Sequence, residues 1–202
     1  MLERIQWLGH GSFLIEGPPT IYINPWRLGQ RSERADIILI SHAHYVHFSP
    51  ADIEKISNPT TRMIGPSAVA REIEGLEVLR PWQTICVGRL SIRGIPAFAG
   101  GSIDTTPRPD GLGFMLSLNY FDIYYAGDTQ YIPEMARLRP DIALLPVDGQ
   151  GTMSASDAAQ AVALMKPRYA IPFNWSATTR GEAAAFQRAV PSASEVVVLQ
   201  PA

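Results

Sequence analysis

Apolar and polar positions alternate along the chain in short runs. Apolar runs bounded by Gly, Pro or Asn are typical of strands, whereas apolar residues spaced three or four apart after a Ser or Thr are typical of helices. The predicted strands cover residues 4–9, 12–17, 20–24, 36–40, 62–66, 76–80, 83–88, 89–98, 111–119, 121–128, 141–147, 168–173 and 196–200. The predicted helices cover residues 51–56, 66–75, 133–139, 154–167 and 181–190.

The order of these elements predicts the layers of the fold. The centre of the chain is rich in strands, and the last third alternates strands with helices. Two packed sheets with helices outside are the simplest arrangement that buries the apolar faces of both kinds of element. Ser49 before Pro50 and Thr179 before Glu182 are expected to cap helices. With 202 residues, the chain is expected to form one domain over residues 1–202.

Composition narrows the choice of function and compartment. Seventeen basic and nineteen acidic residues give a net charge of −2, which does not favour nucleic acid or an anionic membrane as a partner. The apolar runs are much shorter than the ~20 residues of a membrane helix, and the N-terminus does not have the pattern of a signal peptide. The single cysteine, Cys86, rules out an internal disulfide framework and is expected to be buried. These features predict a cytoplasmic protein.

The segment SHAHYVHFSP at residues 41–50 holds three of the four histidines. Imidazoles at positions 42 and 44 of an extended loop point to the same side, and His47 can return to that point if the chain turns into a helix. Neutral imidazoles that meet in this way suit a borderline divalent cation such as zinc. Three solvated histidines are the alternative, which we favour less because the loop follows a buried strand.

Several segments, in order along the chain, resemble the metallo-β-lactamase superfamily. Residues 41–47 resemble its H-x-H-x-D-H signature, and WLGHGSFLIEG resembles the opening hairpin of its branch of small metal-dependent hydrolases related to the ascorbate-6-phosphate lactonases. INPW is similar to the D-P-W turn, YYAGDT to the loop with a bridging aspartate, LLPVDGQGTM to the next strand, and AIPFNW to I-P-x-H-[YW]. The resemblance covers nearly the whole chain.

The resemblance implies an α/β protein with a four-layer αββα sandwich and a site for two metals that share a water. His42 and His44 match ligands of the first metal, and His47 matches a ligand of the second. Asp128 matches the carboxylate that bridges both metals, which also makes it the candidate catalytic residue. The alternative for Asp128 is an ordinary turn residue in the sequence G-D-T.

Four positions depart from the family pattern. Val46 stands where the family has a ligating aspartate, Ala99 lies near an expected histidine, and Asn174 replaces another histidine. Asn24 stands where the D-P-W turn has a supporting carboxylate. The remaining groups predict one divalent metal at most (zinc, manganese or iron), or none.

Four residues are expected near the same pocket: His10, Asn24, Tyr45 and Asn174. The alternative for His10 is a hydrogen-bonded structural histidine. The Asn174 amide is a poor zinc ligand and a better hydrogen-bond partner.

Three functions are compatible with this pattern. We favour a member of the superfamily with an incomplete site and without ordinary two-metal hydrolysis, because Val46 and Asn174 remove groups that position the attacking water. The alternative is an active one-metal hydrolase of phosphoesters or lactones. A third, weaker hypothesis is a redox centre in which two histidines and Asp128 hold iron. A small molecule is the expected ligand, with no nucleic acid or membrane partner, and the sequence does not indicate the oligomeric state.

Overall fold

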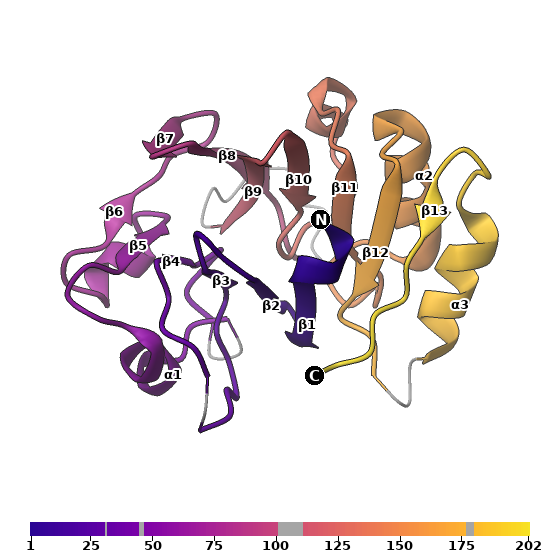
Figure 1. Cartoon of the computed structure of the whole chain (residues 1–202). Coiled ribbons are helices and arrows are strands. Elements are labelled where there is room, and N and C mark those ends of the chain that lie inside the picture. The colour runs from indigo at the N-terminus through magenta and orange to yellow at the C-terminus, as the bar shows by residue number, and fades with distance from the viewer. Residues whose placement is uncertain (31, 45–46, 101–110, 177–179) are drawn as a thin grey trace.

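The computed structural model describes residues 1–30, 32–44, 47–100, 111–176 and 180–202. Its strands form two sheets, in agreement with the predicted α/β class (Figure 1). The six-stranded sheet has the order β1 (Ile5–Gly9), β2 (Ser12–Ile15), β3 (Ile21–Ile23), β4 (Ile37–Leu39), β5 (Arg62–Gly65) and β6 (Glu77–Val78). The seven-stranded sheet has the order β13 (Glu195–Val196), β12 (Tyr169–Phe173), β11 (Ile142–Pro146), β10 (Phe121–Tyr125), β9 (Gly111–Leu118), β8 (Leu90–Ala97) and β7 (Thr84–Val87).

The helices lie outside the two sheets, as the αββα sandwich requires. α2 (Ala155–Met165) packs on β11 and α3 (Arg180–Ala189) on β12, while α1 (Pro50–Ile56) packs on the six-stranded sheet. Three short 3-10 helices complete the described elements: η1 (Leu2–Arg4), η2 (Val69–Arg71) and η3 (Pro133–Arg137). Among the described helices, none has the length and apolar character needed to span a bilayer.

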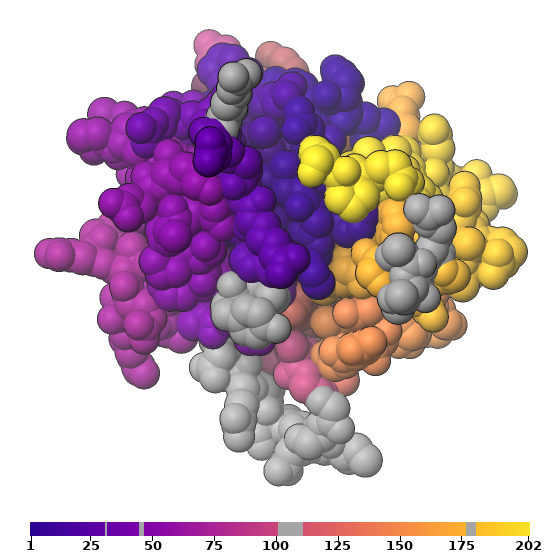
Figure 2. Space-filling model, turned by 90° about the horizontal axis from the view of Figure 1, so that it is seen from below, coloured from indigo at the N-terminus to yellow at the C-terminus, as the bar shows by residue number. Residues whose placement is uncertain are grey.

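Two apolar cores hold these layers together. The larger core lies between the sheets, where Trp7 of β1 meets Trp175 beyond β12 with ring centroids 4.9 Å apart. The smaller core lies between the six-stranded sheet and α1 and includes Ile38 and Ile53. Seen from below, the indigo to magenta residues of the first half of the chain cover the centre and left of the molecule, and the orange and yellow C-terminal residues cover the right (Figure 2). The last described residue contacts β1, since the Ala202 amide donates to the Trp7 carbonyl.

Some predicted elements are shorter in the structure or absent. The helix predicted over 66–75 is only the single turn η2, and the strand predicted over 196–200 is the two-residue β13. The helix predicted over 133–139 is the 3-10 helix η3. The cap predicted at Ser49 is present, whereas Thr179 lies outside the described residues.

Cys86 is exposed, so the prediction that it is buried was wrong. It lies in β7, the edge strand of the seven-stranded sheet, on the same face as exposed Thr84. Residues two apart in a strand share a face. A short run such as Thr84–Val87 does not reveal which of its faces the core will cover.

Candidate metal centre

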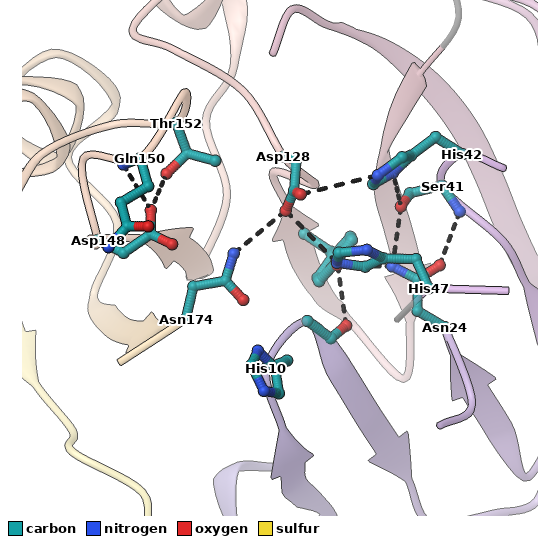
Figure 3. Close-up of polar contacts among 12 residues, drawn as sticks. His10, Asn24, Ser41, His42, His47, Asp128, Asp148, Gln150, Thr152 and Asn174 are labelled. Atoms are coloured by element: carbon teal, nitrogen blue, oxygen red, sulfur yellow. Dashed lines mark hydrogen bonds and ion pairs between the residues drawn. The ribbon is translucent and has the colours of Figure 1, made fainter. Parts of the chain in front are cut away.

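The candidate site lies where several parallel strands end. Asn24 follows β3, His42 comes shortly after β4, Asp128 shortly after β10, and Asn174 directly after β12. The first two strands belong to one sheet and the last two to the other. Because parallel strands bring their carboxyl ends to one edge, side chains far apart in sequence meet there (Figure 3).

A tight turn gathers the three histidines before α1 begins. The amides of His47 and Phe48 both donate to the His44 carbonyl, at 2.8 and 2.7 Å, and Ser49 then caps α1. The ring centroids of His42 and His47 are 4.4 Å apart, and that of His44 is 5.9 Å from each. Each imidazole offers one nitrogen so that all three atoms lie within 4.8 Å of one another. This donor set fits one divalent cation.

Asp128 faces two of these imidazoles from the other sheet (Figure 3). Its Oδ2 is 3.7 Å from His42 Nε2, and its Oδ1 is 3.5 Å from His47 Nε2. These separations are too long for good hydrogen bonds. Two ligands that hold a common zinc at about 2.1 Å in tetrahedral geometry lie about 3.4 Å from each other. The observed spacing therefore fits a shared cation better than direct contact.

The His47 ring is buried without hydrogen bonds. Its side chain is 2% exposed, and within the described residues neither ring nitrogen has a hydrogen-bond partner. Gly11 lies against this ring: a Cβ on Gly11 would come 2.5 Å from His47 Nε2 and 2.9 Å from the Tyr125 hydroxyl oxygen. Leaving a buried polar group unpaired costs about 1–3 kcal/mol. A metal bound at one nitrogen would offset part of that cost.

Burial sets the protonation states of the site. Burial, and to a smaller extent the charge of neighbouring histidines, lowers the pKa of His42 to about 4 and that of His47 to about 2. Burial also raises the pKa of Asp128 to about 6. At neutral pH, both imidazoles are therefore neutral and the carboxylate is ionised, which are the forms that bind a metal.

Asn24 and Ser41 hold His42 from behind. The Asn24 side chain is fully buried; its Nδ2 donates to Ser41 Oγ and to the Tyr125 hydroxyl, each at 2.8 Å, and its Oδ1 accepts from the Ser41 amide. Ser41 Oγ lies 2.9 Å from His42 Nδ1. In the tautomer that carries its proton on Nδ1, this nitrogen donates a hydrogen bond to Ser41 Oγ, and the lone pair of His42 Nε2 then faces Asp128.

Asn174 binds the carboxylate from the side opposite the histidines (Figure 3). Its Nδ2 donates to Asp128 Oδ1 at 3.2 Å. The reversed amide would bring two acceptor oxygens together, so this orientation is the favourable one. A hydrogen bond therefore stands where the resemblance implies a histidine ligand of a second metal.

His10 lies at the exposed rim of the site. Its ring packs edge-on against Trp26, with centroids 4.7 Å apart, and its carbonyl accepts from Trp7 Nε1 at 2.6 Å. Partial burial and Arg27 lower the pKa of His10, and Asp148 opposes that shift. His10, Asn24 and Asn174 all have positive φ angles, of 44°, 49° and 61°. Strained backbone of this kind tends to cluster at functional sites.

Three other predicted positions have different outcomes. Tyr45 and Val46 lie outside the described residues. Ala99 is exposed, and the segment around it is bound to the Asp128 loop, since the Gln130 amide donates to the Phe98 carbonyl at 2.8 Å. Sequence reasoning missed Gly11, Ser41 and Tyr125. Ser41 directly precedes His42, but only the structure shows that Gly11 and Tyr125 contact the site.

Two packed sheets, outer helices and a histidine turn facing an aspartate define the class as a metallo-β-lactamase fold. A family model described as the beta-lactamase superfamily domain matches residues 4–174. A UPF0173 metal-dependent hydrolase from Thermococcus kodakarensis is 32% identical over an alignment 221 positions long, which covers 99% of this chain and 97% of that protein. The chain therefore belongs to the beta-lactamase superfamily and, within it, to the UPF0173 family.

Solved structures agree with this assignment. A protein proposed to be a metal-dependent hydrolase, from Parabacteroides distasonis, matches with a TM-score of 0.88 and 29% identity, covering 97% of this chain and 93% of that one. Igni18, a metallo hydrolase from Ignicoccus hospitalis, matches with a TM-score of 0.79 and 22% identity over 98% of this chain and 94% of that one, which shows the fold alone. The predicted superfamily is confirmed, and the narrower relation to ascorbate-6-phosphate lactonases stays a prediction.

Proposed function

We propose that this chain is a hydrolase with a single divalent metal, held by His42, His44, His47 and Asp128. The observation that carries the proposal is the buried His47 ring, whose nitrogens have no hydrogen-bond partner among the described residues and whose Nε2 faces Asp128. The names of the UPF0173 relatives support metal-dependent hydrolysis as the reaction class.

A second metal is not part of the proposal. It would have only His47 and one oxygen of Asp128 as ligands, and Asn174 already donates a hydrogen bond to that oxygen. Val46, in place of the family's aspartate, removes a further ligand. Too few anionic groups remain to hold a second divalent cation.

The residues of the site suit hydrolysis near neutral pH. A divalent cation bound there lowers the pKa of a coordinated water and polarises a carbonyl or phosphoryl oxygen. The Asp128 carboxylate, one oxygen of which would hold the cation, is suited to accept a proton from the attacking water at its other oxygen. Asn174 orients that carboxylate through its amide hydrogen bond, and Ser41 orients His42. We propose a lactone or a phosphoester as the substrate.

The second candidate is a site that binds a ligand without turnover. Ala99, exposed beside the Asp128 loop, and Asn174 both stand where the resemblance implies metal ligands, which favours an eroded centre. The two candidates differ in metal content and turnover, and both are measurable on the same preparation.

The test is elemental analysis of protein purified without chelator, combined with assays on generic lactones and phosphodiesters. We expect one equivalent of zinc, manganese or iron per chain, and turnover that Asp128→Ala abolishes. Glu54→Ala, which removes an exposed carboxylate from α1, is the matched control and should behave like the parent. Two equivalents would exclude the single-metal proposal, whereas a metal-free chain without turnover would support the eroded site.

Restoring the missing ligands gives an independent test. The combined changes Val46→Asp, Ala99→His and Asn174→His should raise the metal content from one to two equivalents. At about 100 times Kd, each newly bound metal stabilises the native state by about 2.7 kcal/mol, which a thermal melt detects. An unchanged metal content in a folded triple variant would mean that these positions are not the lost ligands.

A further inference from the structure

A second polar cavity lies on the outer face of the seven-stranded sheet. It has a volume of about 400 Å³, within the usual range for small-molecule sites. Strand pairing shows that its floor is one continuous face: Thr84 pairs with Arg93, Ser91 pairs with Ser117, and Ser117 pairs with Asp122. Directly paired residues of neighbouring strands project to the same side of a sheet. The floor therefore presents three hydroxyls beside one guanidinium.

The residues at the end of η3 form the rim of this cavity. Arg137, Leu138 and Arg139 line it together with the strand residues. One terminal nitrogen of Arg139, Nη1, donates to the carbonyls of Ala136 and Leu138. These bonds hold that end of the guanidinium against the backbone. The Arg137 guanidinium lies 5.9 Å from the ring centroid of Trp82, a residue that is 36% exposed.

The charge of the cavity is unbalanced. Three arginines line it against a single aspartate among the described lining residues. Within the described part of the chain, none of the ion pairs involves these arginines. Asp122 accepts a hydrogen bond from Ser117 at 2.5 Å, so part of its acceptor capacity is already used. Convergent guanidinium groups with neighbouring hydroxyls are the donors that bind phosphate in proteins.

The cavity is separate from the metal centre. Its residues come from the start of β8, the end of β9 and the start of β10, whereas Asp128 follows the end of β10. The two sites therefore lie toward opposite ends of the same strands. Figure 1 shows α2 and α3 beside β11–β13, on the part of the sheet away from β7 and β8.

We propose that this cavity binds a small phosphate-bearing molecule, independently of the metal centre. Phosphate is favoured over carboxylate because three guanidinium groups and the hydroxyls of Thr84 and Ser91 offer more donors than one carboxylate accepts, whereas the Ser117 hydroxyl already donates to Asp122. The volume leaves room for an organic group beside the phosphate. The exposed Trp82 ring, next to Arg137, is placed to contact a flat group such as a base.

The test is isothermal titration with pyrophosphate and with adenosine monophosphate. Each titration is repeated after removal of metal by a chelator, since phosphate also binds metal centres. We expect saturable binding that persists without metal, weakens as salt rises, and falls at least tenfold in Arg93→Gln and in Arg137→Gln. Asp122→Asn should bind more tightly, because it removes the carboxylate that repels the ligand.

Arg71→Gln is the matched control, since it removes one exposed positive charge from η2, outside the cavity. It should bind as the parent does. If the Trp82 ring contacts the base, Trp82→Ala should lower the affinity for adenosine monophosphate and leave the affinity for pyrophosphate unchanged. If both affinities equal those of the parent, the site recognises only the phosphate group. Three results would overturn the proposal: no saturable binding below ~1 mM, complete loss of ligand binding once the metal has been removed, or unchanged ligand binding in folded Arg93→Gln and Arg137→Gln.

Discussion

At the scale of single residues, the position of the His47 ring depends on the absence of a side chain at Gly11. Gly11 has no Cβ, and this lets the imidazole lie against the backbone of the β1–β2 turn. The same glycine carbonyl accepts a hydrogen bond from Tyr125 at 2.9 Å, which ties it to the other sheet. One small residue thus permits two contacts that define the site.

Gly11→Ala is expected to displace the His47 ring. The added methyl would lie 2.5 Å from His47 Nε2 and 2.8 Å from Cδ2, far inside van der Waals contact. We expect zinc affinity to fall about 10- to 100-fold, as it does when groups that orient a ligand are changed. Competition titration with a chromophoric chelator measures this.

Gly29→Ala is the control for that change. Within the described residues, a Cβ at Gly29 would meet nothing within 4 Å, and its φ is not positive. Its zinc affinity should equal that of the parent. Parent-like affinity in a folded Gly11→Ala protein would show that His47 does not bind the metal in the position described.

At the scale of elements, the local pattern predicted long, strongly patterned segments better than short ones. Helix α2, with Ser154 before it and apolar residues three and four apart, was predicted at 154–167 and spans Ala155–Met165. The segment 66–75 has similar residues, but the structure forms only one turn there, with Val69 as its buried residue. A single buried side chain does not offset the entropy of ordering a longer helix.

Ser154→Ala is expected to destabilise the protein through α2. Ser154 Oγ accepts from the Asp157 amide, and Asp157 accepts from the Ser154 amide, so one substitution breaks a capping box. The expected loss is about 1 kcal/mol of unfolding free energy, measured by urea titration. Ser67→Ala, in an exposed turn, should change stability by less than about 0.5 kcal/mol. Equal values for both variants would mean that the cap contributes nothing.

At the scale of the whole molecule, we predict that residues 1–202 unfold as one domain. The Trp7–Trp175 contact joins the two sheets, so tryptophan fluorescence reports their packing, whereas far-ultraviolet circular dichroism reports secondary structure. The two signals should change together in urea, because the sheets share one apolar core. Separate transitions would indicate two units.

The stability of the metal-free protein is expected to fall as pH decreases from about 6.5 toward 4. The unfolded chain takes up protons at His42 and His47 near pH 6.5, while the native state does so only near their lowered pKa values of about 4 and 2. Asp128 acts in the opposite sense, because its native pKa is raised to about 6 and the native state takes up its proton first. Two protons minus one leave one net proton, or about 1.4 kcal/mol per pH unit from this site.

Variants separate these two contributions. Asp128→Asn removes the opposing proton and should steepen the pH dependence of the unfolding free energy, whereas His47→Gln should flatten it. Urea titrations between pH 4 and 7 with chelator present measure both slopes. Identical slopes in the parent and both variants would show that these groups titrate in the native state as they do in the unfolded chain.

The sequence by itself determined the class of the fold and the three imidazoles that the histidine turn brings together. Strand-length apolar runs, helix caps and the spacing of His42, His44 and His47 are local properties, and local properties can be read from neighbouring residues. Only the tertiary structure decided that Gly11 and Tyr125 enclose the site, that Asn174 donates to Asp128, and that three arginines converge on the outer sheet. These contacts join residues up to 114 positions apart in the chain, as between Gly11 and Tyr125. They depend on the register and packing of the two sheets, which a single strand's pattern does not specify.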